Sequence, residues 1–241
     1  MKIYGYQRKV TGNDLFLFFF LYFLLILPRT ACGFEILTFG DSITKGWPYV
    51  AYNQNGTMRG GYQQKLAAYL ADEGYPSHVY NWGVGGESTP EGVNRISSVL
   101  GSRAAHYVLI MEGANDVLNG ISASTTSENI GIMIDRSRQR HVIPIVGNIT
   151  PNTMNATYDS RVRNVYNPEV EKIVAAKEVS LARQFEALRP EWETYPLHYG
   201  DHLHPNIDGY RRIATTWCNV IVEVNRPKPP VGAYMLLLLH H

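Results

Sequence analysis

The chain has little cysteine and almost no net charge. Its 241 residues include two cysteines, Cys32 and Cys218, and carry a formal net charge of +1. A nearly neutral chain creates no long-range field, so the composition gives no reason to expect a nucleic-acid partner. If a leader is removed before Gly33, Cys218 is left alone and an intrachain disulfide is excluded. An apolar fraction of 45% is still enough for the packed core of one domain.

The chain also lacks an apolar run long enough to span a bilayer. The run from Leu15 to Leu27 has thirteen residues, whereas a spanning helix needs roughly 20. It follows a basic lead containing Lys2, Arg8 and Lys9, and small residues follow it up to Gly33. This layout predicts that residues 1–33 are a secretory signal peptide, with a retained N-terminal membrane anchor as the alternative. We therefore expect an exported protein, periplasmic or secreted, and the anchor alternative adds membrane association through this segment.

The C-terminal tail, residues 226–241, differs from the rest of the chain. Its first part is rich in proline, and a run of five apolar residues, Met235–Leu239, comes before the last two residues. Five residues cannot cross a bilayer. We expect a disordered tail without a function, which leaves residues 34–225 as a single domain.

Short apolar runs alternate with amphipathic stretches through this domain. Strands are predicted at Phe34–Phe39, His78–Trp82, His106–Met111, Val142–Val146 and Val179–Ala182. Helices are predicted at Gly61–Glu73, Pro90–Leu100, Thr126–Arg140, Asp159–Lys177 and Ile207–Val224, the fourth of them broken before Pro168. The alternation implies a parallel sheet with right-handed crossovers. Pro144 indicates that the fourth strand lies at an edge or is irregular.

The segment Phe39–Ile43 places a serine just past the first predicted strand. Gly40 opens the turn, and the amide of Ser42 then lies at the start of a helix, where it can donate to an oxyanion. Ser42 is therefore a candidate nucleophile, and a simple turn or N-cap serine is the alternative. Thr44 stands where a Gly-x-Ser-x-Gly elbow requires its second glycine, so that motif is absent.

The segment Asp201–Pro205 supplies a candidate base. His204 can accept the proton of a serine, and Asp201, three residues earlier, can bind the other ring nitrogen and fix the tautomer. A surface loop is one alternative. A metal site is another, because His198 and His202 lie close to His204 in the sequence.

Two further segments follow predicted strands. Asn115, after the third strand, has a side-chain amide that can donate to an oxyanion, and an ordinary Asn-Asp turn is the alternative. The glycines of Gly83–Ser88, after the second strand, allow the backbone to approach a ligand closely. Their spacing does not fit a dinucleotide fingerprint. Because ligands of parallel sheets bind beyond the carboxyl ends of the strands, these segments and Ser42 are expected at one edge.

Taken together, these segments resemble the SGNH, or GDSL, hydrolase family over about Ile36 to Ile213. The matching blocks are Gly40-Asp41-Ser42, the glycine loop, Gly113–Asp116 and Asp201–His204. One departure is Ile43, where the short name of the family expects leucine. The resemblance implies an α/β fold, a three-layer α/β/α flavodoxin-like sandwich around a parallel five-stranded sheet.

The resemblance also implies the chemistry of the site. The catalytic residues would be Ser42, Asp201 and His204, and the oxyanion hole would be formed by Ser42, Gly86 and Asn115, with Gly85 as the alternative glycine. The implied reaction is hydrolysis of a carboxylic ester through an acyl-enzyme on Ser42, with no cofactor and no metal.

The substrate class remains open between two types of enzyme. One is a lipolytic esterase of arylesterase, thioesterase or lysophospholipase type, and the other is a carbohydrate O-deacetylase. The partner is thus a small-molecule, lipid or acylated-sugar ester. Trp47, Tyr49 and Tyr52 are candidate substrate-binding residues, and the alternative is that they only pack their loop. A non-catalytic, membrane-tethered binding protein on the same fold is a third hypothesis.

Overall fold

The computed structural model describes residues 33–52, 58–195 and 197–227, and the side chains of residues 51–59 are also left undescribed. The predicted signal peptide or anchor therefore lies outside the described residues, as does the tail from residue 228 onward. Within the described residues, no helix combines the length and the apolar character needed to cross a membrane.

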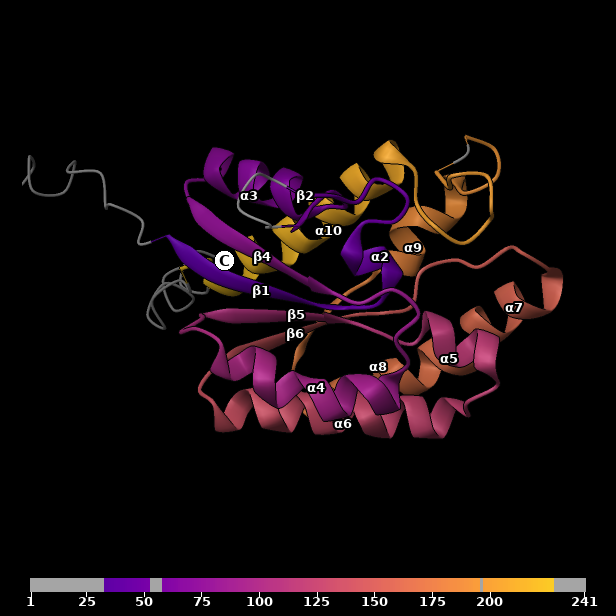
Figure 1. Ribbon diagram of the computed structural model, residues 1–241, viewed down its shortest axis with the longest axis horizontal. Coiled ribbons are helices and arrows are strands. Elements are labelled where there is room, and N and C mark those ends of the chain that lie inside the picture. The colour runs from indigo at the N-terminus through magenta and orange to yellow at the C-terminus, as the bar shows by residue number, and fades with distance from the viewer. Residues whose placement is uncertain (1–32, 53–57, 196, 228–241) are drawn as a thin grey trace, which may run out of the picture. The chain divides into compact units, whose positions relative to one another are not determined.

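Five parallel strands form the central sheet in the order β4-β1-β5-β6-β7, and Figure 1 shows β4, β1, β5 and β6 side by side. The strands are β1 (Phe34–Gly40), β4 (Ser77–Gly83), β5 (Tyr107–Met111), β6 (Ile143–Gly147) and β7 (Ser180–Ala182). Renumbered as strands alone, this order is 2-1-3-4-5, which is the flavodoxin-like arrangement. The predicted α/β fold with a parallel five-stranded sheet is confirmed.

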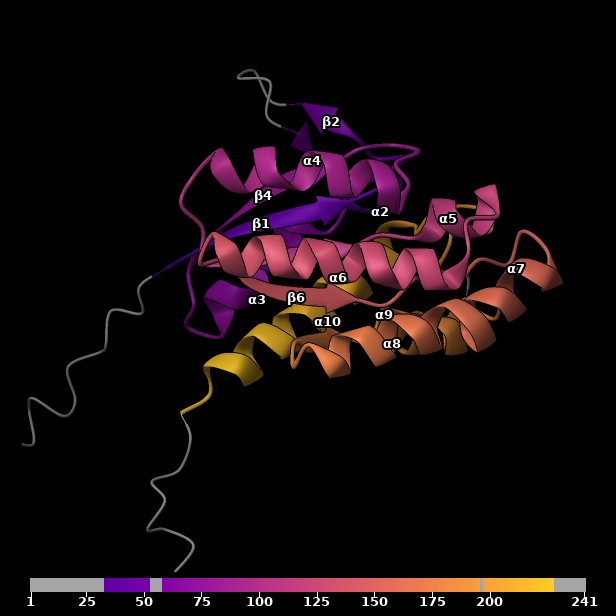
Figure 2. The ribbon, with the colours of Figure 1, turned by 90° about the horizontal axis from the view of Figure 1, so that it is seen from below.

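Helices cover both faces of the sheet (Figures 1 and 2). One face carries α3 (Gln63–Asp72), α9 (Gln184–Leu188) and α10 (Ile207–Asn225), and the other carries α4 (Thr89–Gly101), α6 (Ala123–Gln139) and α8 (Asn167–Ala176).

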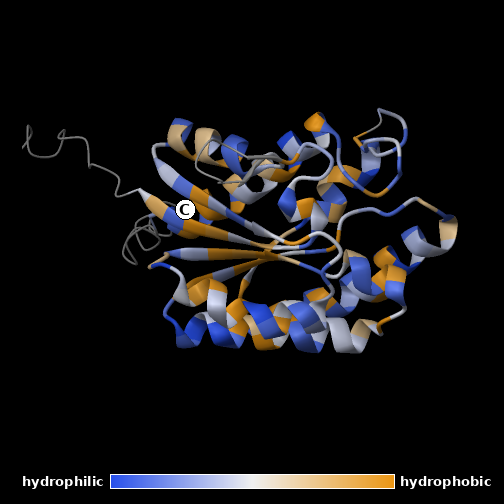
Figure 3. Ribbon diagram, viewed as in Figure 1, coloured by the Kyte–Doolittle hydropathy of each residue, from blue (hydrophilic) through white to orange (hydrophobic). Residues whose placement is uncertain are grey.

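Alternate side chains of each strand enter the two apolar cores, one on each face of the sheet. In β1, Ile36 belongs to the cluster under α3 and α10, and Leu37 belongs to the cluster under α4 and α6. Successive side chains of a strand point to opposite faces, so a strand buried on both sides is apolar throughout. Figure 3 shows this as apolar colour along the central strands, with hydrophilic residues on the outer helices. All five residues of β5 are buried.

Pro144 does not mark an edge. β6 pairs with β5 on one side and β7 on the other, so the edge alternative is wrong. The Ile143 amide donates to the His106 carbonyl on the β5 side, so the next residue faces the opposite side. There the pairing with β7 begins only at Ile145. The missing N–H of Pro144 therefore faces a position where no ladder hydrogen bond is made.

The predicted helix over Asp159–Lys177 is divided in the structure. It consists of α7 (Ala156–Arg161), a π-helical turn η1 (Val162–Tyr166) and α8, with Pro168 in the first turn of α8. The π-helical turn runs directly into α8, since the Asn167 amide donates to the Val162 carbonyl, so the chain stays helical up to Pro168.

Several short elements had no counterpart in the prediction. They are α5 (Ala114–Asn119), the 3₁₀ turn η2 (Arg189–Glu191), and the antiparallel pair β2 (Ala51–Tyr52) and β3 (Met58–Arg59), together with α9. The helix expected to start at Ser42 is present as the short α2 (Ser42–Lys45).

Candidate active site

The turn after β1 presents Ser42 at the start of α2. A Cβ atom at Gly40 would lie 2.2 Å from the Met111 carbonyl oxygen and 2.3 Å from Thr44 Oγ1, so only glycine fits there. Asp41 caps α2, because its Oδ1 accepts the Ile43 amide at 2.8 Å. The chain thus turns sharply from strand to helix, and Ser42 is placed at the carboxyl edge of the sheet.

Asp41 is a buried acid, with only 2% of its surface exposed. Burial raises its pKa to about 7, and the charges of Glu87 and Asp116 act in the same direction, against the hydrogen bond from the Ile43 amide. A carboxyl group with this pKa stays partly protonated at neutral pH, directly beside the candidate nucleophile.

This burial predicts how stability depends on pH. Between the ordinary pKa of 3.8 and about 7, the folded chain binds the Asp41 proton more strongly than the unfolded chain does. The free energy of unfolding therefore falls as the pH rises through this window, by as much as a few kcal/mol. Asp41→Asn keeps the cap and removes the titration. In urea unfolding, we measure the free energy of unfolding of the variant minus that of the wild type. We expect this difference to be larger at pH 8 than at pH 4.

A matched control is Asp72→Asn, which changes an exposed carboxylate of α3. Its stability difference from the wild type should stay nearly constant with pH. An Asp41→Asn difference that is equally constant would contradict the raised pKa.

The base lies on the loop that precedes α10. His204 Nε2 is 2.8 Å from Ser42 Oγ, although the two residues are 162 positions apart in the sequence. The loop is closed at its base, because the Tyr199 amide donates to the His204 carbonyl and the Asn206 amide donates to the Leu197 carbonyl, each at 2.8 Å. The structure therefore brings together the serine and histidine that the sequence singled out.

Asp201 holds His204 from the other side. Its Oδ2 lies 2.6 Å from His204 Nδ1, and its Oδ1 accepts the amides of Leu203 at 3.0 Å and His204 at 2.9 Å. Burial alone would raise the pKa of Asp201, but these hydrogen bonds outweigh it and hold the pKa below its ordinary value. The ionised carboxylate keeps the ring proton on Nδ1, so that Nε2 is free to accept from Ser42.

Gly86 and Asn115 extend from strands that neighbour β1. Gly86 follows β4 with a φ of +80°, a conformation that favours glycine. Asn115 lies in the first turn of α5, after β5, and its Nδ2 donates to the Glu87 carbonyl at 2.8 Å. Because β4 and β5 flank β1 in the sheet, the segments carrying Ser42, Gly86 and Asn115 all begin at the same edge.

The three predicted aromatic residues have different environments. Trp47 is 50% exposed, and its ring centre lies 6.3 Å from that of His204, inclined at 66°. Tyr49 packs edge-on against Tyr210 and against Tyr199, a residue that the sequence did not single out. The side chain of Tyr52 lies outside the described residues. Trp47 is thus the aromatic side chain beside the serine–histidine pair, whereas Tyr49 is engaged in packing.

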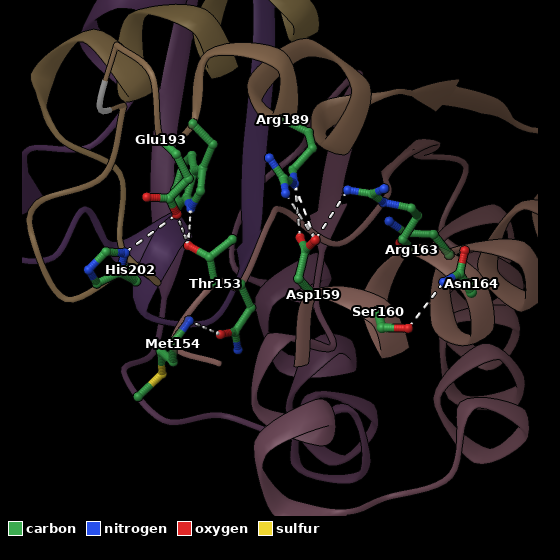
Figure 4. A network of polar contacts seen from close by, with 12 residues as sticks. Thr153, Met154, Asp159, Ser160, Arg163, Asn164, Arg189, Glu193 and His202 are labelled. Carbon is green, nitrogen blue, oxygen red and sulfur yellow. Dashed lines mark hydrogen bonds and ion pairs between the residues drawn. The ribbon is translucent and has the colours of Figure 1, made fainter. Parts of the chain in front are cut away.

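The metal alternative grouped His204 with His198 and His202, but the structure separates His204 from the other two histidines. His204 is occupied by Ser42 and Asp201, whereas Glu193, His198 and His202 place their potential ligand atoms within 4.8 Å of one another. Figure 4 shows Glu193 between His202 and Thr153. The Gly200 amide donates to His198 Nδ1 at 3.0 Å, so the ring proton is on Nε2, the atom that faces Glu193. Coordination of a metal through Nε2 would require the loss of that proton and of the hydrogen bond from Gly200. We therefore interpret the cluster as a set of hydrogen bonds and not as a metal site.

Sequence reasoning gave no role to Asp116, a buried acid that lies close to the end of the glycine loop. Asp116, fully buried, accepts from the Thr89 amide at 2.8 Å and from the hydroxyls of Thr89 and Thr126 at 2.5 Å and 2.7 Å. It thereby ties the start of α4 to α5 and α6. The signals for Asp116 in the sequence were its place in the Gly113–Asp116 block and its position directly after Asn115, past a strand buried on both faces.

Comparisons with known proteins show which family the chain is similar to. Residues 38–212 match the sequence model of the GDSL-like lipase/acylhydrolase family. Esterase TesA of Pseudomonas aeruginosa is 27% identical over 191 residues, which cover 79% of this chain and 89% of the relative. A protein of Escherichia coli K12 named thioesterase 1/protease 1/lysophospholipase L1 is 24% identical over 199 residues, covering 81% and 86%. The crystal structure of Axe2, an acetylxylan esterase from Geobacillus stearothermophilus, superposes with a TM-score of 0.67 at 18% identity, covering 80% of this chain and 96% of that one.

Proposed function

Because the chain belongs to the GDSL-like lipase/acylhydrolase family, we propose that its ester hydrolysis proceeds through an acyl-enzyme on Ser42. The chain is a carboxylic ester hydrolase, in keeping with the esterase and arylesterase among its relatives. The observation that carries the mechanism is the continuous contact from Ser42 Oγ to His204 Nε2 at 2.8 Å and from His204 Nδ1 to Asp201 Oδ2 at 2.6 Å.

In the acylation step, Ser42 Oγ attacks the ester carbonyl while its proton passes to His204 Nε2. Asp201 stabilises the imidazolium that forms. The negatively charged carbonyl oxygen accepts from the amides of Ser42 and Gly86 and from one N–H of Asn115 Nδ2, whose other N–H is bound to the Glu87 carbonyl. The imidazolium then protonates the leaving alkoxide. Water repeats the sequence on the acyl-enzyme and releases the acid.

For the substrate, we propose an ester whose acyl or alcohol part lies against Trp47. A half-exposed indole beside His204 offers an apolar face to an acyl chain or to the face of a sugar ring. Relatives named as a lysophospholipase and an acetylxylan esterase support the two alternatives equally.

A panel of esters tests both the mechanism and the substrate. Activity would be measured on p-nitrophenyl acetate, butyrate and octanoate and on acetylated xylan, with and without a serine-directed phosphonate. Increasing kcat/KM with chain length indicates a lipolytic esterase, whereas release of acetate from xylan indicates a deacetylase. Phosphonate found by peptide mass spectrometry anywhere but on Ser42, or no inhibition by it, would contradict the proposed nucleophile.

Trp47→Ala is expected to reduce kcat/KM for the octanoate ester about tenfold more than for the acetate ester, if the acyl chain contacts the indole. The loss of about 1–2 kcal/mol corresponds to the apolar area that the indole covers on a long chain. Ile132→Ala, which removes another exposed apolar side chain, on α6, should leave the ratio unchanged. Equal losses for both esters would place the acyl chain elsewhere.

We also propose that the protein is exported through cleavage of a signal peptide within residues 1–33. The basic lead, the apolar run and the small residues after it support this proposal. The N-terminal sequence of the mature protein tests it, because a retained anchor would leave residues 1–33 attached.

A further inference from the structure

The side-chain amide of Asn115 is fixed from one side by the glycine loop. One N–H of Nδ2 donates to the Glu87 carbonyl at 2.8 Å, which leaves the second N–H for another acceptor. An amide group is planar, so the direction of the second N–H is set once the first has its partner. Whatever positions the Glu87 carbonyl therefore also aims the remaining donor of Asn115.

Glu87 is itself held by an ion pair in which its own carboxylate is buried and the guanidinium of Arg95 is partly exposed. Its carboxylate accepts from Arg95 Nε at 2.6 Å and from Arg95 Nη2 at 2.5 Å, with side-chain exposures of 4% for Glu87 and 23% for Arg95. The guanidinium also lies 4.0 Å from the centre of the Phe39 ring in β1. Two parallel hydrogen bonds fix direction as well as distance, so α4 and β1 together hold Glu87 in one orientation.

A second buried acid lies beside this pair. Glu112, at the end of β5, is 2% exposed, and no hydrogen-bond partner of its carboxyl oxygens is found among the described residues. Burial, followed by the charges of Asp41 and Glu87, raises its pKa well above the ordinary value. The raised pKa favours the neutral form of Glu112, which attracts the guanidinium of Arg95 less than an ionised carboxylate would.

We propose that the Arg95–Glu87 ion pair is the positioning device of the oxyanion hole, acting through the Glu87 carbonyl on the Asn115 amide. This inference rests on the oxyanion role proposed above for Asn115. Neither Arg95 nor Glu87 touches the reacting atoms in this scheme. They are positioning residues, and the group that they orient makes the contact that strengthens in the transition state.

A purely structural role for the pair predicts a different kinetic result. Loss of a contact made only in the transition state lowers kcat and kcat/KM together and leaves KM unchanged. Two residues that act through one group are also non-additive, so the second loss has little effect once the first has occurred. If the pair only attached α4 to the sheet, its loss would lower thermal stability and the amount of folded protein. The loss of activity would then be the same factor whether or not Asn115 is present.

The experiment combines Glu87→Gln with Asn115→Ala in a double-mutant cycle on the preferred p-nitrophenyl ester. Asn115→Ala alone is expected to lower kcat about 10²–10³-fold. Glu87→Gln keeps the size of the side chain but breaks the two-bond contact, and we expect a loss of about 10–10²-fold in kcat at unchanged KM. Added to Asn115→Ala, it should cost less than about threefold. Asp135→Asn, which breaks an ion pair between Asp135 on α6 and Lys177 at the end of α8, is the matched control and should retain wild-type kcat.

Circular dichroism and thermal melting identify variants that do not fold. If Glu87→Gln does not fold, Arg95→Lys replaces it, because lysine keeps the positive charge and loses the two-pronged geometry. Restoring arginine should restore kcat. Two results would overturn the proposal: wild-type kcat in a folded Glu87→Gln or Arg95→Lys protein, or an equal loss with and without Asn115.

The same measurements separate this inference from the proposed function. An inactive wild type that does not react with phosphonate at Ser42 would disprove the proposed function. A wild type that is active and sensitive to Asn115→Ala, but insensitive to Glu87→Gln, would disprove only the positioning role.

Discussion

Replacing Ser42 with alanine is expected to lower kcat/KM for every ester substrate by about 10⁵–10⁶-fold. Alanine removes the oxygen that attacks the carbonyl, and nothing else in the site can replace it. His204 keeps its bond to Asp201, and the backbone amides remain. Residual hydrolysis above the uncatalysed rate then measures what the oxyanion donors and substrate binding contribute on their own.

The fold should survive this change. Ser42 is the first residue of the four-residue helix α2, whose cap is the Asp41 side chain rather than the Ser42 hydroxyl. The melting temperature is therefore expected to stay within a few degrees of the wild type, because a partly exposed hydroxyl contributes little. Ser124→Ala, which removes an exposed hydroxyl from the first turn of α6, should retain full activity. A folded Ser42→Ala protein with more than a few per cent of wild-type activity would restore the non-catalytic hypothesis for this site.

Asp201→Asn is expected to reduce kcat about 10⁴-fold while leaving the fold in place. The asparagine carbonyl oxygen can replace Oδ1 and continue to accept the Leu203 and His204 amides. Its NH₂ group would then replace Oδ2, 2.6 Å from His204 Nδ1. Two donors cannot face each other, so the ring proton moves to Nε2. The imidazole then donates to Ser42 and no longer accepts its proton.

Steady-state kinetics would show this as a loss in kcat with little change in KM. The matched control is Asp208→Asn, since Asp208 is an exposed carboxylate on the first turn of α10 that pairs with Arg211. A loss of tenfold or less for a folded Asp201→Asn protein would mean that another group orients His204.

The arrangement of the serine, the base and its acid was predictable because each belongs to a short segment whose fold is local. Gly40 permits the turn before Ser42, and Asp201 binds the amides of its own loop as well as the His204 ring. The sheet could also be predicted, since runs such as the one in β5 are apolar on both faces. The order of the strands then places the segments together without further information.

What could not be predicted depends on tertiary contacts. The Arg95–Glu87 pair joins a loop to a helix eight residues later, and the sequence gives no sign that both side chains point inward. The position of Pro144 in an interior strand depends on where β7 begins to pair, which is not a property of β6 itself. Helices of four or five residues, such as α2 and α9, are too short to show a 3.6-residue period.

The loop that closes at Leu197 and Asn206 carries both the imidazole and the carboxylate, whereas the hydroxyl belongs to the rim of the sheet. Displacement of this one loop would separate the proton acceptor from the nucleophile while the acceptor kept its correct tautomer. An antibody or peptide that bound and displaced the loop from outside would thus inactivate the enzyme reversibly, without contacting Ser42.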